Sequence, residues 1–233
     1  MRRVHPEPQA ELTDEELGSL YAFPTEGRWI RANMVSTLDG AMRGPDGGSR
    51  SINTAADQRV FSIARLAADV TLVGAGTIRA EDYRPSLRPI AIVTSRLDLP
   101  LTLRLFAERT DAHPRPLVMT TAEAAGRAPE ELATAADLIP CGSVSVDLAL
   151  VIEELVERGL KHINCEGGPG LLGDLAAAGL LDELLLTLSP ALLGGGPSEH
   201  ILNVTGGLQP ALRLTTAHVL SEDGTVLIRA RRA

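Results

Sequence analysis

The stretch HINCEGGPG at residues 162–170 decides the fold, because it predicts a strand that passes directly into a helix. The predicted strand covers residues 162–165, and the helix opens on Pro169. Free backbone N–H groups at a helix start favour phosphate binding, and adjacent glycines let a ligand approach the backbone. No Gly-Lys-Ser/Thr follows, so this is not a Walker A loop. The stretch predicts a ligand-binding junction, and the alternative is a plain turn with a solvated Glu166.

Outward from this junction, strands and helices alternate along most of the chain. The predicted strands are residues 28–35, 69–73, 89–94, 115–120, 184–188, 211–220 and 224–230. The predicted helices are residues 14–21, 148–155 and 169–178, one that starts after Thr54, and a helical connection at 122–136. Alternation followed by strands alone implies an α/β fold with a mostly parallel sheet and antiparallel C-terminal strands. We expect residues 1–27 to be an N-terminal extension and residues 28–233 a single domain.

The composition is that of an ordinary globular protein. The chain has 233 residues, of which 44% are hydrophobic and 22% charged. It carries 22 Lys and Arg against 30 Asp and Glu, and this net charge of −8 argues against nucleic acid and anionic membranes as partners. No apolar run approaches the roughly 18 residues of a membrane span. Two cysteines and a polar N-terminus indicate a cytoplasmic protein.

A second glycine-containing segment, Gly74 to Ala80, follows a predicted strand and resembles half of a dinucleotide-binding fingerprint. Arg79 stands where the third glycine would be, and nearby prolines leave little room for the long helix of a Rossmann unit. We therefore disfavour a Rossmann fold. A nucleotide contact on another fold is the better interpretation, and a tight turn is the alternative.

Three further features carry weaker signals. The turn at residues 37–40 is typical of Asp-Gly, although the Thr37 hydroxyl could serve a ligand. Residues 194–197, Gly-Gly-Gly-Pro, predict a bending loop. None of the five histidines stands at metal-ligand spacing with another His or Cys, so we expect no metal.

In combination, these segments resemble the reductase domain of riboflavin biosynthesis, a pyrimidine reductase with a dihydrofolate-reductase-like fold. The resemblance covers about residues 28–230 and is carried by residues 33–40, 51–54, the helix that reaches Arg65, 73–82, 166–169 and 193–196. It implies a three-layer α/β sandwich. This chain departs from the family at Asn33, where relatives often have Lys, at residues 51–53 and at residues 81–83. By the resemblance, these positions lie on the substrate side of the site.

The resemblance implies NADPH as hydride donor and a ribosylaminopyrimidine 5′-phosphate as substrate, whose sugar is reduced to a ribityl chain. It also implies a homodimer, and a reductase that stands alone, because the sequence lacks the pair of motifs, His-x-Glu followed by Pro-Cys-x-x-Cys, that a fused deaminase needs. Two alternatives stay open. One is an NADPH-dependent reductase of a pterin or dihydrofolate, and the other is an NADPH-binding protein without turnover.

Candidate substrate residues follow from carboxylate and guanidinium chemistry together with the resemblance. We expect Glu166 and Asp39 to face the substrate, because a carboxylate accepts well from ring N–H donors, and one of them could supply a proton. Asn33 is the third substrate candidate. Arg65, helped by Arg84 or Arg88, is expected to bind the phosphate; an ordinary surface position of Arg65 is the alternative.

The cofactor is expected along the two glycine segments, with a cation for its 2′-phosphate at the end of the strand 89–94. Ser95 and Arg96 supply a hydroxyl and a guanidinium there, and no acidic residue stands at 94–97 to accept a free 2′-hydroxyl. The full set of cofactor candidates is Thr37, Asn53, Gly74, Ala75, Gly76, Thr77, Glu81, Ser95, Arg96, Gly167, Gly168, Pro169, Gly170, Leu171 and Leu172.

Overall fold

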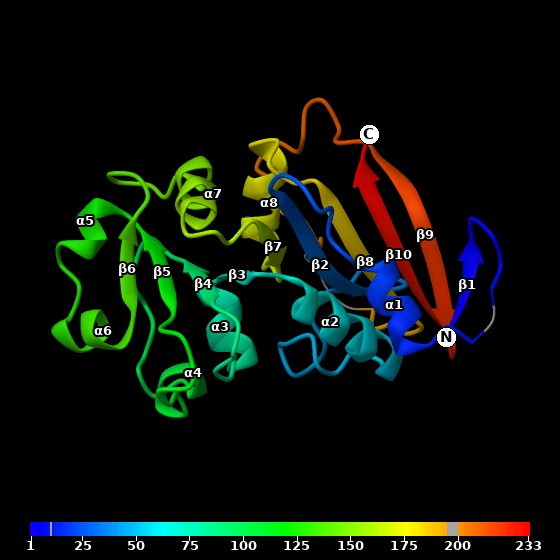
Figure 1. Ribbon diagram of the computed structural model, residues 1–233, viewed down its shortest axis with the longest axis horizontal. Helices are drawn as coiled ribbons and strands as arrows, with labels where there is room; N and C mark the ends of the chain where they lie inside the picture. The colour runs from blue at the N-terminus through cyan, green and yellow to red at the C-terminus, as the bar shows by residue number, and fades with distance from the viewer. Residues whose placement is uncertain (10, 195–199) are drawn as a thin grey trace.

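The computed structural model describes residues 1–9, 11–194 and 200–233, and these form one ten-stranded sheet with the order β1-β9-β10-β8-β2-β7-β3-β4-β5-β6. The strands are β1 (Arg2–His5), β2 (Trp29–Thr37), β3 (Val70–Gly74), β4 (Ile90–Val93), β5 (Leu117–Thr120), β6 (Asp137–Pro140), β7 (His162–Cys165), β8 (Glu183–Ser189), β9 (Leu214–Glu222) and β10 (Thr225–Arg232). Figure 1 shows the sheet along the long axis of the molecule, with β6 at one end and β1 at the other.

The pairing confirms the predicted sheet type. Strands β8, β2, β7, β3, β4, β5 and β6 run parallel to one another. Strands β10, β9 and β1 add an antiparallel edge, in which β9 and β10 form the predicted closing hairpin. Because parallel strands end at one edge of a sheet, β2, β7, β3 and β4 bring their carboxyl ends together.

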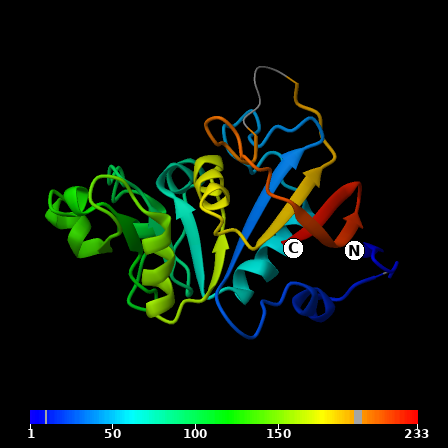
Figure 2. The ribbon, with the colours of Figure 1, turned by 90° about the horizontal axis from the view of Figure 1, so that it is seen from above.

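Helices cover both faces, which gives the predicted three layers. The helices of the described residues are α1 (Asp14–Leu20), α2 (Ala55–Ala67), α3 (Ala75–Glu81), α4 (Arg104–Ala107), α5 (Ala122–Ala125), α6 (Glu130–Ala135), α7 (Leu148–Glu157) and α8 (Pro169–Ala177). Helices α7 and α8 pack on one face, against Ile30 and Leu72. On the other face α3, α4 and α6 pack against Val73, and α1 and α2 pack against Leu185. Figure 2 shows the twist of the sheet between these helices.

Local sequence signals start several of these helices where the sequence predicts them. Thr13 and Glu16 form a reciprocal capping box at α1. Thr54 caps α2 through the backbone N–H of Asp57. Pro169 occupies the first turn of α8, where its missing N–H is not needed. These signals depend on neighbouring residues only, so the sequence alone predicts them.

The structure adds elements that the sequence analysis missed. Strands β1 and β6 and the short helix α4 were not predicted, and the helical connection at 122–136 is two helices interrupted by Gly126 to Pro129. The segment 74–80 is no simple turn, because α3 starts at Ala75. Gly74 precedes α3 without a side-chain cap, so no capping signal marks its start.

Residues 1–27 contribute β1 and α1 to the body of the protein. Strand β1 pairs with β9, and α1 packs on α2. Of the predicted loop 194–197, Gly195, Gly196 and Pro197 lie outside the described residues. Across the described ranges, no helix has the length and apolar character needed to cross a membrane.

Candidate active site

The two glycine segments lie side by side at the carboxyl edge of the sheet. Strands β7 and β3 are neighbours, so residues 166–168 and 74–77 leave the sheet together. The backbone N–H of Gly74 donates to the Gly167 carbonyl at 2.8 Å. Strand β4 is next in the order, so the predicted pair Ser95 and Arg96 follows on the same edge. Neighbouring strands are about 4.8 Å apart, and the three junctions therefore form a continuous shelf roughly 10 Å long.

The shelf is closely packed at its glycines. A side chain at Gly167, which has φ +77°, would meet the Met34 sulfur at 3.1 Å. A Cβ at Gly168 would lie 3.1 Å from the Thr77 hydroxyl oxygen. Gly168 begins α8 without a side-chain cap, so the first N–H groups of that helix are not satisfied by a capping side chain. Backbone donors on a surface kept free of side chains fit the phosphates of a dinucleotide.

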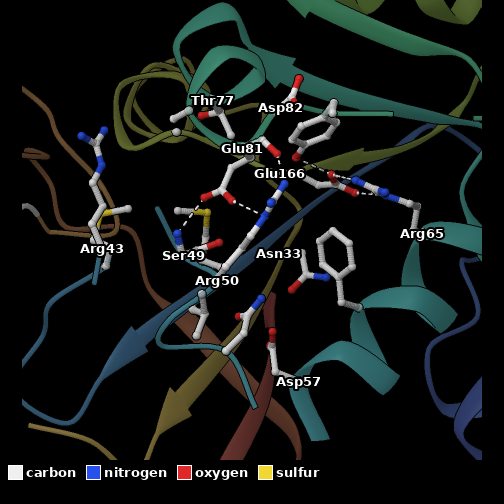
Figure 3. Close-up of a pocket in the computed structure, with 18 of the residues that line it drawn as sticks. Asn33, Arg43, Ser49, Arg50, Asp57, Arg65, Thr77, Glu81, Asp82 and Glu166 are labelled. Carbon is white, nitrogen blue, oxygen red and sulfur yellow. Dashed lines mark hydrogen bonds and ion pairs between the residues drawn. The ribbon is translucent and has the colours of Figure 1, made fainter. Parts of the chain in front are cut away.

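A cavity of about 500 Å³ opens beside the shelf. Its walls come from β2, the loop before α2, α2 itself, α3 with the residues after it, and the start of α8 (Figure 3). The predicted site residues in its wall are Asn33, Asn53, Arg65, Thr77, Glu81, Arg84, Glu166, Gly168 and Pro169. Side chains from segments far apart in sequence thus meet one small-molecule-sized space.

Glu166 is the most heavily bonded group of this cavity. Arg65 binds its carboxylate with two N–H groups, of which Nε donates to Oε1 at 2.7 Å and Nη2 donates to Oε2. The Tyr83 hydroxyl donates to Oε2 at 2.8 Å, and Asn164 Nδ2 donates to Oε1 at 3.0 Å. Burial, and next the Glu166 charge, raise the pKa of Tyr83 well above its ordinary value. Glu166 is therefore held as an acceptor in one orientation.

Arg65 is oriented from both sides. Its guanidinium lies 4.6 Å from the ring centre of Phe61 and 5.2 Å from that of Tyr83. Burial alone would lower the pKa of Arg65, but its bonds to Glu166 outweigh burial and raise the pKa. Two N–H groups of the Arg65 guanidinium are thus bound to Glu166, whereas the sequence predicted that Arg65 binds the substrate phosphate.

Helix α2 presents one face to the cavity through Asp57, Phe61 and Arg65, which are four residues apart. Residues at that spacing share a face of a helix. Neither Asp57 nor Phe61 is among the site residues predicted from the sequence, although both line the cavity. The signal was present as this regular spacing, but the same spacing also suits core packing.

A group of arginines gathers at the other side of the cavity. Arg50 forms an ion pair with Glu81, in which Arg50 Nε lies 3.6 Å from Glu81 Oε2. Glu81 also accepts a hydrogen bond from the backbone N–H of Ser49 at 2.7 Å. Arg104 binds Glu108 at 2.7 Å, and Arg84 lies 3.9 Å from the same carboxylate. These pairs are half-exposed, so an incoming anion can compete with the carboxylates for the guanidinium groups.

Several predicted site residues lie outside the cavity wall. Asp39 is exposed and accepts from Thr37 and from the N–H groups of Leu193 and Gly194, and these bonds lower its pKa. It therefore ties the end of β2 to the segment after β8. Arg88 lies outside the wall too and reaches the Leu66 carbonyl at 3.4 Å. Thr37, Gly74, Ala75, Gly76, Ser95, Arg96, Gly167 and Gly170 lie at the strand ends or in the segments that follow them. Leu171 and Leu172 lie in α8 with their side chains buried in the core.

The fold class is that of dihydrofolate-reductase-like α/β reductases. A pyrimidine reductase-like protein from Corynebacterium diphtheriae superposes with a TM-score of 0.78 at 21% identity, over 88% of this chain and 92% of the other. Dihydrofolate reductase from Enterococcus faecalis, solved as a complex with NADP(H), gives a TM-score of 0.50 at 15% identity, over 88% and 96% of the two chains. These likenesses confirm the expected fold.

Sequence comparison then gives the family. The model of the RibD C-terminal domain matches residues 28–226, so the chain belongs to the RibD C-terminal domain family. A relative from Methanothermobacter thermautotrophicus, named 2,5-diamino-6-ribosylamino-4(3H)-pyrimidinone 5′-phosphate reductase, is 28% identical over 212 residues, which are 84% of this chain and 94% of the relative. The resemblance to riboflavin-pathway reductases is thereby confirmed.

Proposed function

We propose that this protein is an NADPH-dependent reductase of a ribosylaminopyrimidine 5′-phosphate. The observation that carries the proposal is the juxtaposition of the glycine shelf with a cavity that holds the ion pair between buried Glu166 and half-buried Arg65. A shelf without side chains suits a dinucleotide, and an adjoining polar cavity suits a second, smaller reactant. The family membership supports the same reaction class.

The chain's own residues divide the work of binding. Gly74, Gly167 and Gly168 carry no side chain, so the cofactor can approach their backbone, and the cofactor supplies a hydride when bound. The Ser95–Arg96 pair is proposed to hold a 2′-phosphate. Asp98, an acidic residue nearby, lies 3.4 Å from Arg79 and is thereby partly neutralised, which favours a phosphate over a free ribose hydroxyl.

The substrate phosphate is proposed to bind at Arg50, Arg84 and Arg104 rather than at Arg65. These three line the cavity and pair with half-exposed carboxylates, whereas both donors on one side of the Arg65 fork are taken by buried Glu166. Planar guanidinium groups bind phosphate with two parallel hydrogen bonds. Glu166 and Arg65 then act as a rigid wall that orients the sugar.

The proposed reduction takes place at the open-chain form of the sugar. Opening of the ribosyl ring leaves a C=N bond between C1 and the exocyclic nitrogen of the pyrimidine. A hydride adds to C1, a proton adds to the nitrogen, and the sugar becomes a ribityl chain. Packing of the cavity between α2 and α3 holds C1 in one position, which raises the rate through proximity.

A substrate panel tests the proposal. Absorbance of the nicotinamide is followed with the diaminopyrimidinone ribosyl phosphate, its deaminated uracil counterpart and dihydrofolate. We expect turnover with a pyrimidine and none with dihydrofolate. Turnover of dihydrofolate alone would make the protein a folate reductase, and tight NADPH binding without any turnover would make it a cofactor-binding protein.

We also propose that the protein works as a cytoplasmic homodimer. Both cysteines are free and buried, which suits a reducing compartment. Leu38, Leu192 and Leu193 are exposed next to one another, because the Leu38 N–H donates to the Ala191 carbonyl at 3.0 Å. Apolar side chains grouped in this way favour an interface between copies. Light scattering of the purified protein measures the mass directly, and a monomer at working concentration would contradict the proposal.

A further inference from the structure

One side of the cavity carries three polar groups that the proposed reaction does not use. Asn33 of β2, Asn53 before α2, and Asp57 of α2 all line it. We call these three residues the polar floor. Figure 3 shows Asn33 and Asp57 in the lower part of the cavity, below the Glu166–Arg65 pair.

Asp57 is buried without a cationic partner. Only 5% of it is exposed, and among the described residues no Lys or Arg forms an ion pair with it or lowers its pKa. Burial raises its pKa, which the Thr187 hydroxyl opposes only in part. A buried carboxylate with so little compensation destabilises the free protein unless a ligand donates hydrogen bonds to it.

The two amides of the polar floor are also incompletely paired. Asn33, with 7% exposed, has a buried Nδ2 that finds no acceptor among the described residues. Asn53 has a buried Oδ1 that finds no donor among them. Buried polar atoms in native proteins are nearly always paired, so unpaired atoms in a cavity wall point to a ligand. Together the polar floor offers acceptors on Asp57 and Asn53 and a donor on Asn33.

This pattern complements one edge of an aminopyrimidinone. The 2-amino group and the ring N3–H are adjacent donors, and the 4-oxo group beside them is an acceptor. We propose that Asp57 accepts from the 2-amino group and N3–H, that Asn33 and Asn53 bind neighbouring ring atoms, and that the polar floor thereby selects the 2-amino-4-pyrimidinone ring. This inference rests on the proposed function and specifies the substrate of the same site.

The polar floor discriminates against the deaminated ring by repulsion. A uracil carries an oxo group at position 2, and this oxygen would face a carboxylate oxygen of Asp57. A site built to accept hydrogen bonds from a substrate strongly rejects an analogue that lacks the donor, because a buried group is then left unpaired. Phe61, one turn further along α2, presents an aromatic ring beside the polar floor and suits a flat heterocycle.

Asp57→Asn tests the inference, because a carboxamide offers one donor and one acceptor and so fits the 2-oxo and N3–H edge of uracil. In the wild type, kcat/KM is expected to favour the diaminopyrimidinone ribosyl phosphate over the uracil compound by about a hundredfold or more. In Asp57→Asn, kcat/KM for the diamino compound falls about ten- to a hundredfold, mainly through KM. The uracil compound gains, so the preference narrows or reverses.

Asp174→Asn is the matched control, because Asp174 is an exposed helix residue outside the cavity. We expect the Asp174→Asn variant to show the same substrate preference as the wild type. Titration calorimetry with the two ribityl products gives the same comparison without turnover. If the wild type reduces neither pyrimidine, the proposed function fails. If it reduces a pyrimidine but prefers uracil, or if Asp57→Asn leaves the preference unchanged, the inference about the polar floor is overturned while the proposed function stands.

Discussion

Gly168 is one of two residues of the shelf, with Gly167, at which a side chain has little room. A Cβ added at Gly168 would lie 3.1 Å from the Thr77 hydroxyl oxygen. A branched side chain at this position would therefore occupy the space next to the first turn of α8. We expect Gly168→Val to weaken NADPH binding by at least tenfold, because the backbone N–H groups are no longer accessible to the phosphates. Fluorescence titration of NADPH measures the loss.

Gly18→Val is the control for that variant. Gly18 is a helical glycine of α1, and a Cβ there meets nothing within 4 Å. Its NADPH affinity should equal that of the wild type. An unchanged affinity in folded Gly168→Val, checked by circular dichroism, would show that the cofactor does not lie at this glycine.

Arg65 is expected to position Glu166 rather than to bind the phosphate. In Arg65→Ala the buried carboxylate loses two hydrogen bonds, so kcat/KM should fall about ten- to a hundredfold. The fall should be equal for phosphorylated and dephosphorylated substrate. Steady-state kinetics with both compounds decides, and Arg127→Ala, which removes a surface arginine, is the control. A larger fall in kcat/KM for the phosphorylated compound would show that Arg65 binds the phosphate.

Among the elements, β9 carries a buried histidine that makes stability depend on pH. His218 is 4% exposed, and its ring contacts that of Tyr21 edge-on at 5.1 Å. Burial, and next the Arg229 charge, lower its pKa to about 4. The unfolded chain, with a histidine pKa of about 6.5, binds the proton first as pH falls. The stabilisation is therefore complete above pH ~6.5 and is lost as pH falls towards ~4.

We expect His218→Phe to reduce this pH dependence. Between those two pH values the histidine contributes a loss of roughly 3 kcal/mol to the free energy of unfolding, since each pKa unit corresponds to about 1.4 kcal/mol. Urea unfolding at pH 7.5 and 4.5 measures it, and exposed His5→Asn provides the control. Equal pH dependence in the wild type and His218→Phe would show that other groups cause the loss.

At the scale of elements, the sequence predicts what depends on near neighbours. The caps at Thr13 and Thr54 and the proline start of α8 are such signals, and these helices are confirmed. Strand β1 was missed because it lies at the sheet edge with only one partly buried residue, so it has no alternating pattern. Strand β6 is equally short, and Ile139 is its only buried residue.

The candidate site was harder to predict because it is assembled across the sequence. Arg65 meets Glu166 over a separation of 101 residues, and no local pattern indicates that pairing. Asp39 and Glu166 both carry a carboxylate group. Asp39 is exposed, however, whereas Glu166 lines the cavity. Only the three-dimensional arrangement separates them. The family resemblance supplied the segments, and the fold decides which side chains share a space.

Across the whole molecule, the parallel half of the sheet sets the order of the ligand-binding parts. Thr37 ends β2, Glu166 follows β7, Gly74 ends β3 and Arg96 lies beyond the end of β4, and these strands are successive neighbours. An extended dinucleotide along this edge would place its 2′-phosphate end at Arg96. The cavity lies at the opposite end of the shelf, beside Glu166.

Arg96→Ala tests this order from its far end. A charge-assisted hydrogen bond contributes about 1.5–3 kcal/mol, so NADPH affinity should fall roughly ten- to a hundredfold while NADH affinity stays nearly constant. Calorimetric titration with both cofactors measures the difference. Equal losses would make Arg96 a structural residue, and a wild-type preference for NADH would contradict the cofactor assignment.

In the proposed reaction, the shelf and the cavity together deliver a hydride to the sugar carbon C1. The most direct test uses NADPH that carries deuterium at the transferable position of the nicotinamide, with the diaminopyrimidinone ribosyl phosphate as substrate. We expect mass spectrometry and NMR to find the deuterium at C1 of a ribityl product. Deuterium on a ring carbon of the heterocycle, or no transfer to any substrate of the panel, would contradict it.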